Sequence, residues 1–134
     1  MRPTPLGPTF ALAATLLLTA RAAQAQAARP APPGSAPDSS LLTPATIDAG
    51  RKLFHGRGSC FACHGDKLQG GPIAPPLTGA SWRHITGTYD AIINRIDNGL
   101  PGTAMVAHPG GISEAQVILV GTYVYAVSHH LAPP

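Results

Sequence analysis

The sequence predicts an all-α domain of three to four short helices joined by long loops. Segments 45–54, 89–98 and 113–129 carry apolar residues at helical spacing. The passages 65–86 and 99–111 are instead rich in glycine and proline. Loops of that length are uncommon inside a compact domain unless they have a particular role. We therefore expect short helices whose loops wrap around a large bound group.

The N-terminal part of the chain is predicted to lie outside this domain. Arg2, an apolar run and a small-residue cleavage site form a secretory signal peptide over residues 1–25. The apolar run is shorter than the ~20 residues that cross a bilayer, so we expect no transmembrane segment in the mature chain. Residues 26–42 are rich in Ala and Pro and predict a flexible leader. The domain itself is expected over 43–134.

The first helix is expected to start at Thr43-Pro44, because a capping hydroxyl followed by proline is typical of a helix N-terminus. One helical stripe is formed by Ile47, Gly50, Arg51 and Phe54. Glycine within a helix costs about 1 kcal/mol relative to alanine. We therefore expect another helix to cross closely at Gly50. The first helix should break at 56–58, where two glycines occur.

The two later helices have their own boundary signals. Segment 89–98 should end at Gly99, and its Arg95 is expected at the surface. The last helix should begin at Ser113, which is followed by an acidic residue suited to the first turn. Because β-branched residues are frequent there, a strand is the alternative for 117–127. The length of the segment without a turn signal favours a helix.

Cys60, Cys63 and His64 form the pattern C-x-x-C-H, which is typical of covalent attachment of a c-type haem. Each thiol adds across one haem vinyl group, and one short helical turn can reach both. His64 then supplies the proximal ligand to the iron. A thioredoxin-like pair would need a preceding strand in a βαβ unit. A zinc site would need a further ligand pair, which His55 and His84 do not form. We predict one covalently bound haem c.

Met105 is the candidate for the opposite axial position on the iron. It is the only methionine besides the initiator and lies in a Gly/Pro-rich loop, from which a thioether can reach the open haem face. Alternatively, it fills a gap in the core. The rival distal ligand is a histidine such as His108. With both axial positions filled, the iron has no place for substrate, and its chemistry is one-electron transfer.

From about residue 43 to 130 the chain resembles a small class I mono-haem bacterial cytochrome c, of the type also found as a domain in oxidase and dehydrogenase subunits. The resemblance rests on the segments Gly50-x-x-x-Phe54, Cys60-x-x-Cys63-His64-Gly65, Ala74-Pro75-Pro76-Leu77-x-Gly79, Asn98-Gly99-Leu100-Pro101 and Tyr123. It implies that the first and last helices cross near the haem edge. Gly50 and Phe54 would then meet Gly121 and Tyr123.

The resemblance also implies contacts to the cofactor. Pro75 would offer its carbonyl to the proximal imidazole, which strengthens the ligand. Leu77 would pack on the ring. Trp82 and Arg83 are candidates to hydrogen-bond a haem propionate, although Trp82 as core and Arg83 as a solvated side chain is the alternative. Because a domain of this size has a marginal core, we expect the apoprotein to be largely unfolded.

These features predict an exported, periplasmic electron carrier and not an enzyme in its own right. Its redox partners would be a donor dehydrogenase or membrane complex and an acceptor oxidase or reductase. One alternative is the cytochrome subunit of a periplasmic dehydrogenase complex, and another is a five-coordinate haem protein that binds a gas or peroxide. Without residues 1–25, seven Lys/Arg face six Asp/Glu. This near-neutral balance gives no support to nucleic-acid binding.

Overall fold

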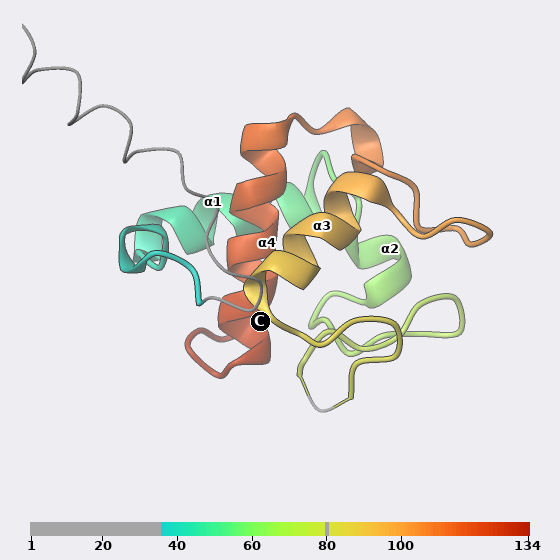
Figure 1. Ribbon diagram of the computed structural model, residues 1–134, viewed down its shortest axis with the longest axis horizontal. Coiled ribbons are helices and arrows are strands. Elements are labelled where there is room, and N and C mark those ends of the chain that lie inside the picture. The colour runs from blue at the N-terminus through green and yellow to red at the C-terminus, as the bar shows by residue number, and fades with distance from the viewer. Residues whose placement is uncertain (1–35, 80) are drawn as a thin grey trace, which may run out of the picture. The chain divides into compact units, whose positions relative to one another are not determined.

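The computed structural model describes residues 36–79 and 81–134 (Figure 1). In chain order they form η1 (Ser39–Leu41), α1 (Pro44–His55), α2 (Phe61–His64), α3 (Tyr89–Asn98), η2 (Pro109–Gly111) and α4 (Glu114–Ser128). The described residues contain no strand. This confirms the small all-α cytochrome c fold predicted from the sequence.

The predicted signal peptide (1–25) lies outside the described residues, as does the leader as far as residue 35. The last part of the leader contains the short 3-10 helix η1, which Asp38 caps by accepting a hydrogen bond from the Ser40 N–H. The composition of 26–42 did not indicate this turn. No helix among the described residues is long and apolar enough to cross a membrane.

Local signals set the ends of the three longer helices as predicted. Thr43 accepts a hydrogen bond from the Thr46 N–H at 3.1 Å, and Pro44 opens α1. Ser113 and Gln116 form a reciprocal capping box at the start of α4. Gly99 follows α3 with a φ of 65°, a conformation that glycine adopts without strain. The predicted boundaries of these helices are therefore confirmed.

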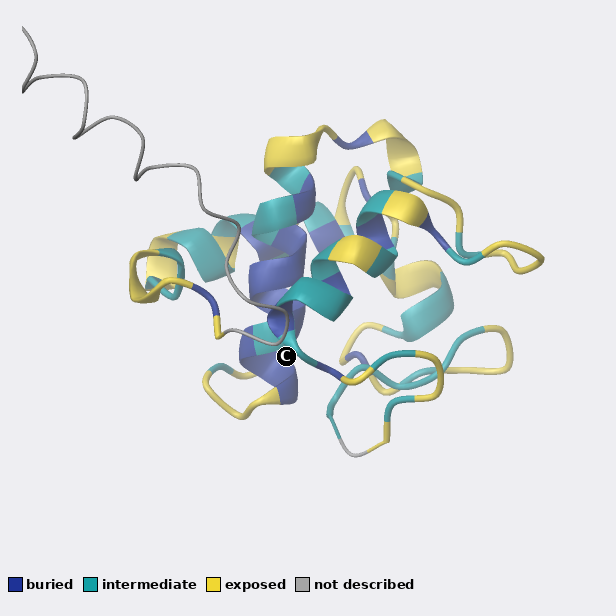
Figure 2. Ribbon diagram, in the orientation of Figure 1, coloured by how far each residue is buried: buried dark blue, intermediate teal, exposed yellow. Residues whose placement is uncertain are grey.

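Helix α4 is the centre of the core, with α1 and α3 packed against it (Figure 1). Nine of its fifteen residues are buried (Figure 2). A helix that is apolar on most of its faces is typical of a core element, so the strand alternative for 117–127 was wrong. The buried hydrophobic cluster comprises Phe54, Leu68, Ile92, Ile96, Ile112, Val117, Val120, Tyr123, Val124 and Val127.

The crossing of α1 and α4 depends on Gly50. A Cβ at Gly50 would overlap the Leu119 carbonyl and lie 2.8 Å from the Tyr123 Cβ. Beside it, the rings of Phe54 and Tyr123 meet edge to face with centroids 5.6 Å apart. The predicted close crossing at Gly50 is therefore confirmed.

The role expected for Gly121 at this crossing was wrong. A Cβ at Gly121 would overlap the side chain of Ile93, so this glycine faces α3. Leu119 and Tyr123 are four residues apart and share the face of α4 that meets α1. Gly121 lies between them in sequence and therefore points to the other side of the helix.

Candidate functional site

The C-x-x-C-H motif lies on the single-turn helix α2, directly after the turn that ends α1. Cys60 donates its backbone N–H to the Phe54 carbonyl at 3.0 Å, which ties the start of the motif to the end of α1. Gly65, with a φ of 80°, ends α2 immediately after His64. The predicted helical turn thus carries both cysteines and the histidine on one short, anchored element.

All eight predicted site residues line one cavity of about 250 Å³. Its walls come from α2, from the loop between α2 and α3, from α3 itself, from the loop after α3 and from α4. The predicted residues in this lining are Cys60, Cys63, His64, Pro75, Leu77, Trp82, Arg83 and Met105. Val120 and Val124 add the apolar face of α4.

The two cysteines are not joined in a disulfide and are half-buried at the cavity wall. Burial raises the pKa of the Cys60 thiol to about 11. Among the described residues, no three His, Cys, Asp or Glu side chains are grouped so that they could hold a metal ion. The zinc alternative required such a group around Cys60 and Cys63.

His64 is held by a backbone carbonyl from the following loop. Its Nδ1 donates to the Pro75 carbonyl at 2.9 Å, which leaves Nε2 as the nitrogen with a free lone pair. Burial lowers the pKa of His64, and the bond to Pro75 opposes that shift. A neutral imidazole with a fixed tautomer is the form that binds a metal.

Gly70 allows Pro75 to approach His64 so closely. The Gly70 N–H donates to the His64 carbonyl at 2.7 Å. A Cβ at Gly70 would lie 2.8 Å from the Pro75 carbonyl carbon, and the φ of Gly70 is +78°. Any side chain here would therefore push Pro75 away from the imidazole.

Met105 reaches the same cavity from the loop that follows α3. Its carbonyl accepts the Leu100 N–H at 2.8 Å, and its own N–H donates to the Thr103 hydroxyl at 3.1 Å. These bonds close residues 100–105 into a compact loop. The Met105 side chain is half-buried and packs against the core cluster.

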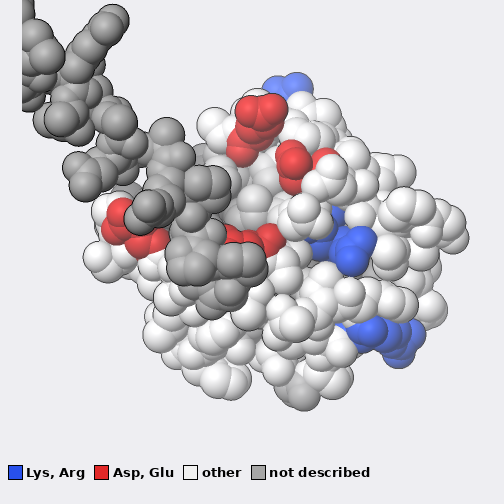
Figure 3. Space-filling model, in the orientation of Figure 1, with Lys and Arg blue, Asp and Glu red and all other residues white. Residues whose placement is uncertain are grey.

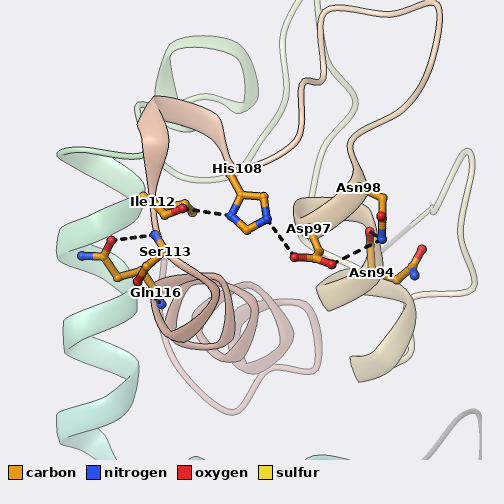
Figure 4. Close-up of polar contacts among 7 residues, drawn as sticks. All are labelled: Asn94, Asp97, Asn98, His108, Ile112, Ser113 and Gln116. Carbon is orange, nitrogen blue, oxygen red and sulfur yellow. Dashed lines mark hydrogen bonds and ion pairs between the residues drawn. The ribbon is translucent and has the colours of Figure 1, made fainter.

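His108, the rival distal ligand, is not part of the cavity lining. Its Nδ1 lies 2.9 Å from the Ile112 carbonyl and its Nε2 lies 2.9 Å from an Asp97 carboxylate oxygen (Figure 4). Both ring nitrogens are therefore engaged away from the cavity. Apart from His64, the histidine among the described residues that lines the cavity is the exposed His84.

Comparison with protein families gives one match that covers most of the folded part. Residues 45–124 match the family model described as cytochrome C oxidase, cbb3-type, subunit III. The chain belongs to this family. It is a cytochrome c domain, and its function is haem-based electron transfer. A search of solved structures gave no significant match.

Arg95 is a cavity residue of this cytochrome that the sequence interpretation missed. It was expected at the surface, but it is half-buried and lines the cavity. Its guanidinium donates to the Gly99 carbonyl at 2.9 Å and to the His84 carbonyl at 3.4 Å, while its buried Nε has no partner among the described residues. The available signal was its spacing, because Arg95 lies one turn after the buried Ile92.

The lining of this cytochrome cavity fits a haem. It is mainly apolar and contains two arginines, Arg83 and Arg95, but no Asp or Glu. Haem is a flat apolar ring with two vinyl groups and two anionic propionates. Two thiols, an imidazole, a thioether and two guanidinium groups match these parts, and the unpartnered Nε of Arg95 is a donor suited to a propionate.

Trp82 and Arg83 are neighbours in sequence, and both line the cavity. The Trp82 indole packs against Gly87, where a Cβ would overlap the ring, and it contacts the core cluster. Arg83 is exposed. Among the described residues, neither side chain makes a hydrogen bond to the protein. Their donors are therefore available to a bound group.

Proposed function

We propose that the protein is an exported class I cytochrome c that transfers single electrons through one haem with His64 and Met105 as axial ligands. The observation that carries this proposal is that both side chains line the cavity that also holds the two thiols of the motif. They reach it from different segments, α2 and the loop after α3. Haem, when bound, supplies an iron that gains and loses one electron.

The protein residues hold and tune this group. Cys60 and Cys63 would each form a thioether by adding the S–H bond across a vinyl double bond. The Pro75 carbonyl keeps the proton on His64 Nδ1, so Nε2 remains available to the iron. Thioether sulfur on the other side favours reduced iron and raises the reduction potential relative to a second imidazole.

The remaining wall would orient the ring and its propionates. Leu77 contributes apolar surface from a position fixed by its N–H bond to the Leu68 carbonyl at 2.8 Å. Trp82, Arg83 and Arg95 would donate to the propionates. Charge-assisted hydrogen bonds of this kind offset the cost of desolvating a carboxylate. The pocket therefore supplies both the apolar and the cationic parts that haem requires.

Electrons would enter and leave at an apolar rim of the cavity. Ile73 is 69% exposed and Val106 is 61% exposed, and both belong to the cavity lining. Charged side chains on the face shown in Figure 3 lie in small separate groups with uncharged surface between them. A small, weakly charged patch suits the short-lived contacts of an electron carrier.

The sequence and the family support the proposed partners and location. The signal-like N-terminus supports export to the periplasm, where c-type haem is attached in bacteria. The family description names an oxidase subunit, which supports an oxidase complex as the electron acceptor. The donor would be a dehydrogenase or membrane complex.

Optical spectra of the holoprotein and of Met105→Ala test this function. We expect a far-red thioether-to-iron band in the oxidised wild type and its loss in Met105→Ala. The reduced variant should also bind CO readily, because its sixth position is open. Val106→Ala is the matched control, since Val106 is the next residue and also lines the cavity. A high-spin wild type that binds CO readily would instead support the five-coordinate alternative.

A further inference from the structure

His108 occupies an unusual position at the end of the Met105 loop, which we define as residues 99–108. Its backbone is left-handed, with φ 46° and ψ 57°, a conformation uncommon for residues other than glycine. Its ring lies between Asp97, in the last turn of α3, and the Ile112 carbonyl, just before α4 (Figure 4). The side chain thus joins the end of the loop to both helices that flank it.

Both ring nitrogens of His108 face acceptors. A carboxylate and a backbone carbonyl accept hydrogen bonds, so the ring links the two when both of its nitrogens carry a hydrogen. The bond to Asp97 is then charge-assisted. Beside the segment that follows His108, Arg57 has its guanidinium 4.0 Å from the position of a Cβ at Gly111, and Glu114 lies in the first turn of α4.

Asp97 lies at a position where an acid does not stabilise its own helix, α3. The C-terminal end of a helix carries partial negative charge, which disfavours an acid in the last turn. The Asn98 side-chain amide donates a long hydrogen bond to the second Asp97 carboxylate oxygen, at 3.5 Å. The His108 Nε2 lies 2.9 Å from the other Asp97 carboxylate oxygen and gives this acid a partner outside its own helix. The acid is therefore better explained by its pairing with His108 than by helix stability.

In the described part of the chain, the other hydrogen bonds from the Met105 loop to the scaffold lie at its two ends, where Gly99 also accepts from the Arg95 guanidinium. The first N–H of the loop, at Gly99, donates to the Arg95 carbonyl at 2.9 Å, and its last, at His108, donates to the Ile96 carbonyl at 3.0 Å. Between these ends, Leu100 bonds to Met105 itself. Among the described residues, His108 is the loop residue whose side chain is hydrogen-bonded to both α3 and the start of α4.

We propose that His108, through Asp97 and the Ile112 carbonyl, is a positioning residue that holds the Met105 sulfur in the cavity. This inference rests on the proposed function, in which Met105 binds the iron. Without the side-chain contacts, the loop keeps its backbone bonds at Gly99 and His108, but its far end loses the links to Asp97 and to the start of α4 and is freer to move. Met105 then leaves the iron more often, while the helical core is unchanged.

The test uses the holoprotein with His108→Gln, Asp97→Asn and the double variant. His130→Gln is the matched control, because His130 is also left-handed with a φ of 60° and its side chain makes no hydrogen bond to the described residues. Added imidazole binds oxidised iron only when Met105 has left. We expect about tenfold tighter imidazole binding in each single variant, equivalent to about 1.4 kcal/mol. The far-red band should also disappear at a lower temperature.

Three results would overturn the inference. Imidazole affinity equal to that of His130→Gln would show that His108 does not hold the loop. Loss of the band together with helical circular dichroism would show a general stabilising role. Fully additive effects in the double variant would show that His108 and Asp97 do not act as a pair. In contrast, absence of the band from the wild type would contradict the proposed function itself.

Discussion

The two sides of the cavity are built differently. On the His64 side, the proposed ligand directly follows the two cysteines at the end of α2, where the Pro75 carbonyl accepts its Nδ1–H, Gly70 packs on the Pro75 backbone and Leu68 is fully buried. On the Met105 side, the proposed ligand lies in a loop whose next residue, Val106, is largely exposed. If both residues bind the iron as proposed, we expect ligand exchange to take place at Met105 while His64 stays fixed.

Removal of the two thiols should have the largest effect on haem retention and stability. It removes the covalent attachment, which is expected on the His64 side and not on the Met105 side. In Cys60→Ala/Cys63→Ala we expect no covalent haem on a denaturing gel and loss of cooperative thermal unfolding, since the core is marginal without the cofactor. Met105→Ala should keep its haem through the same treatment. A double variant that folds cooperatively without haem would contradict the expected dependence of the fold on the cofactor.

Substitution of two glycines, one on each side of the cavity, tests how tightly each side is packed. Gly70 and Gly102 both have a φ of +78°, but a Cβ at Gly70 meets the Pro75–Pro76 backbone, whereas a Cβ at Gly102 meets nothing within 4 Å. We expect Gly70→Ala to lower the free energy of unfolding by about 3 kcal/mol and Gly102→Ala by about 1 kcal/mol.

Denaturant unfolding of the two holoproteins measures this difference. Gly70→Ala should also raise the reduction potential, because a displaced Pro75 carbonyl makes His64 a weaker donor to the iron. Equal destabilisation by the two substitutions would show that the His64 side is no more tightly packed than the Met105 side.

Arg95 donates hydrogen bonds to the His84 carbonyl, in the loop before α3, and to the Gly99 carbonyl, directly after α3. We therefore expect its charge to change the reduction potential without displacing His64 or Met105. Arg95→Gln removes a cation from the cavity wall, which favours oxidised iron. We expect the midpoint potential to fall by tens of millivolts, where 59 mV corresponds to a tenfold change for one electron. Arg95→Lys should restore most of it. Lys52→Gln, which alters an exposed pair with Asp48, is the control and should leave the potential unchanged.

Substitutions at the exposed rim of the cavity should have the smallest effect. The His64 side contributes Ile73 to this rim, and the Met105 side contributes Val106. Ile73→Glu and Val106→Glu should each slow electron self-exchange between oxidised and reduced molecules by about three- to tenfold, because a charge is added where two copies meet. Line broadening in NMR spectra measures this rate. Leu131→Glu is the control, because Leu131 is 59% exposed but is not in the cavity lining. An equal effect there would exclude the rim as the contact surface.

The sequence predicted features that depend on neighbouring residues. The caps at Thr43 and Ser113, the stop at Gly99 and the spacing of Cys60 to His64 are local signals, and the helices follow them. The predicted site residues all lie in the cavity lining, and the resemblance supplied Pro75 and Leu77 among them. Whether these residues bind haem as proposed is a question for the variants above.

The close crossing at Gly50 was predicted, but other features that depend on how helices face one another were not. Arg95 was assigned to the surface because its charge outweighed its spacing, and Gly121 was assigned to the wrong neighbour because both faces of α4 are covered. The bonds of His108 depend on Asp97, eleven residues earlier, and on a left-handed backbone that no local pattern indicates.

The crossing of α1 and α4 also limits how early in synthesis the first helix can pack. Gly50 meets Leu119 and Tyr123, so the first helix of the domain cannot complete its packing until the last helix has been synthesised. The C-x-x-C-H motif emerges well before that helix. If the chain is exported from its N-terminus as proposed, both thiols would be accessible before α4 closes one wall of the cavity, and the late arrival of α4 would leave an interval for haem attachment.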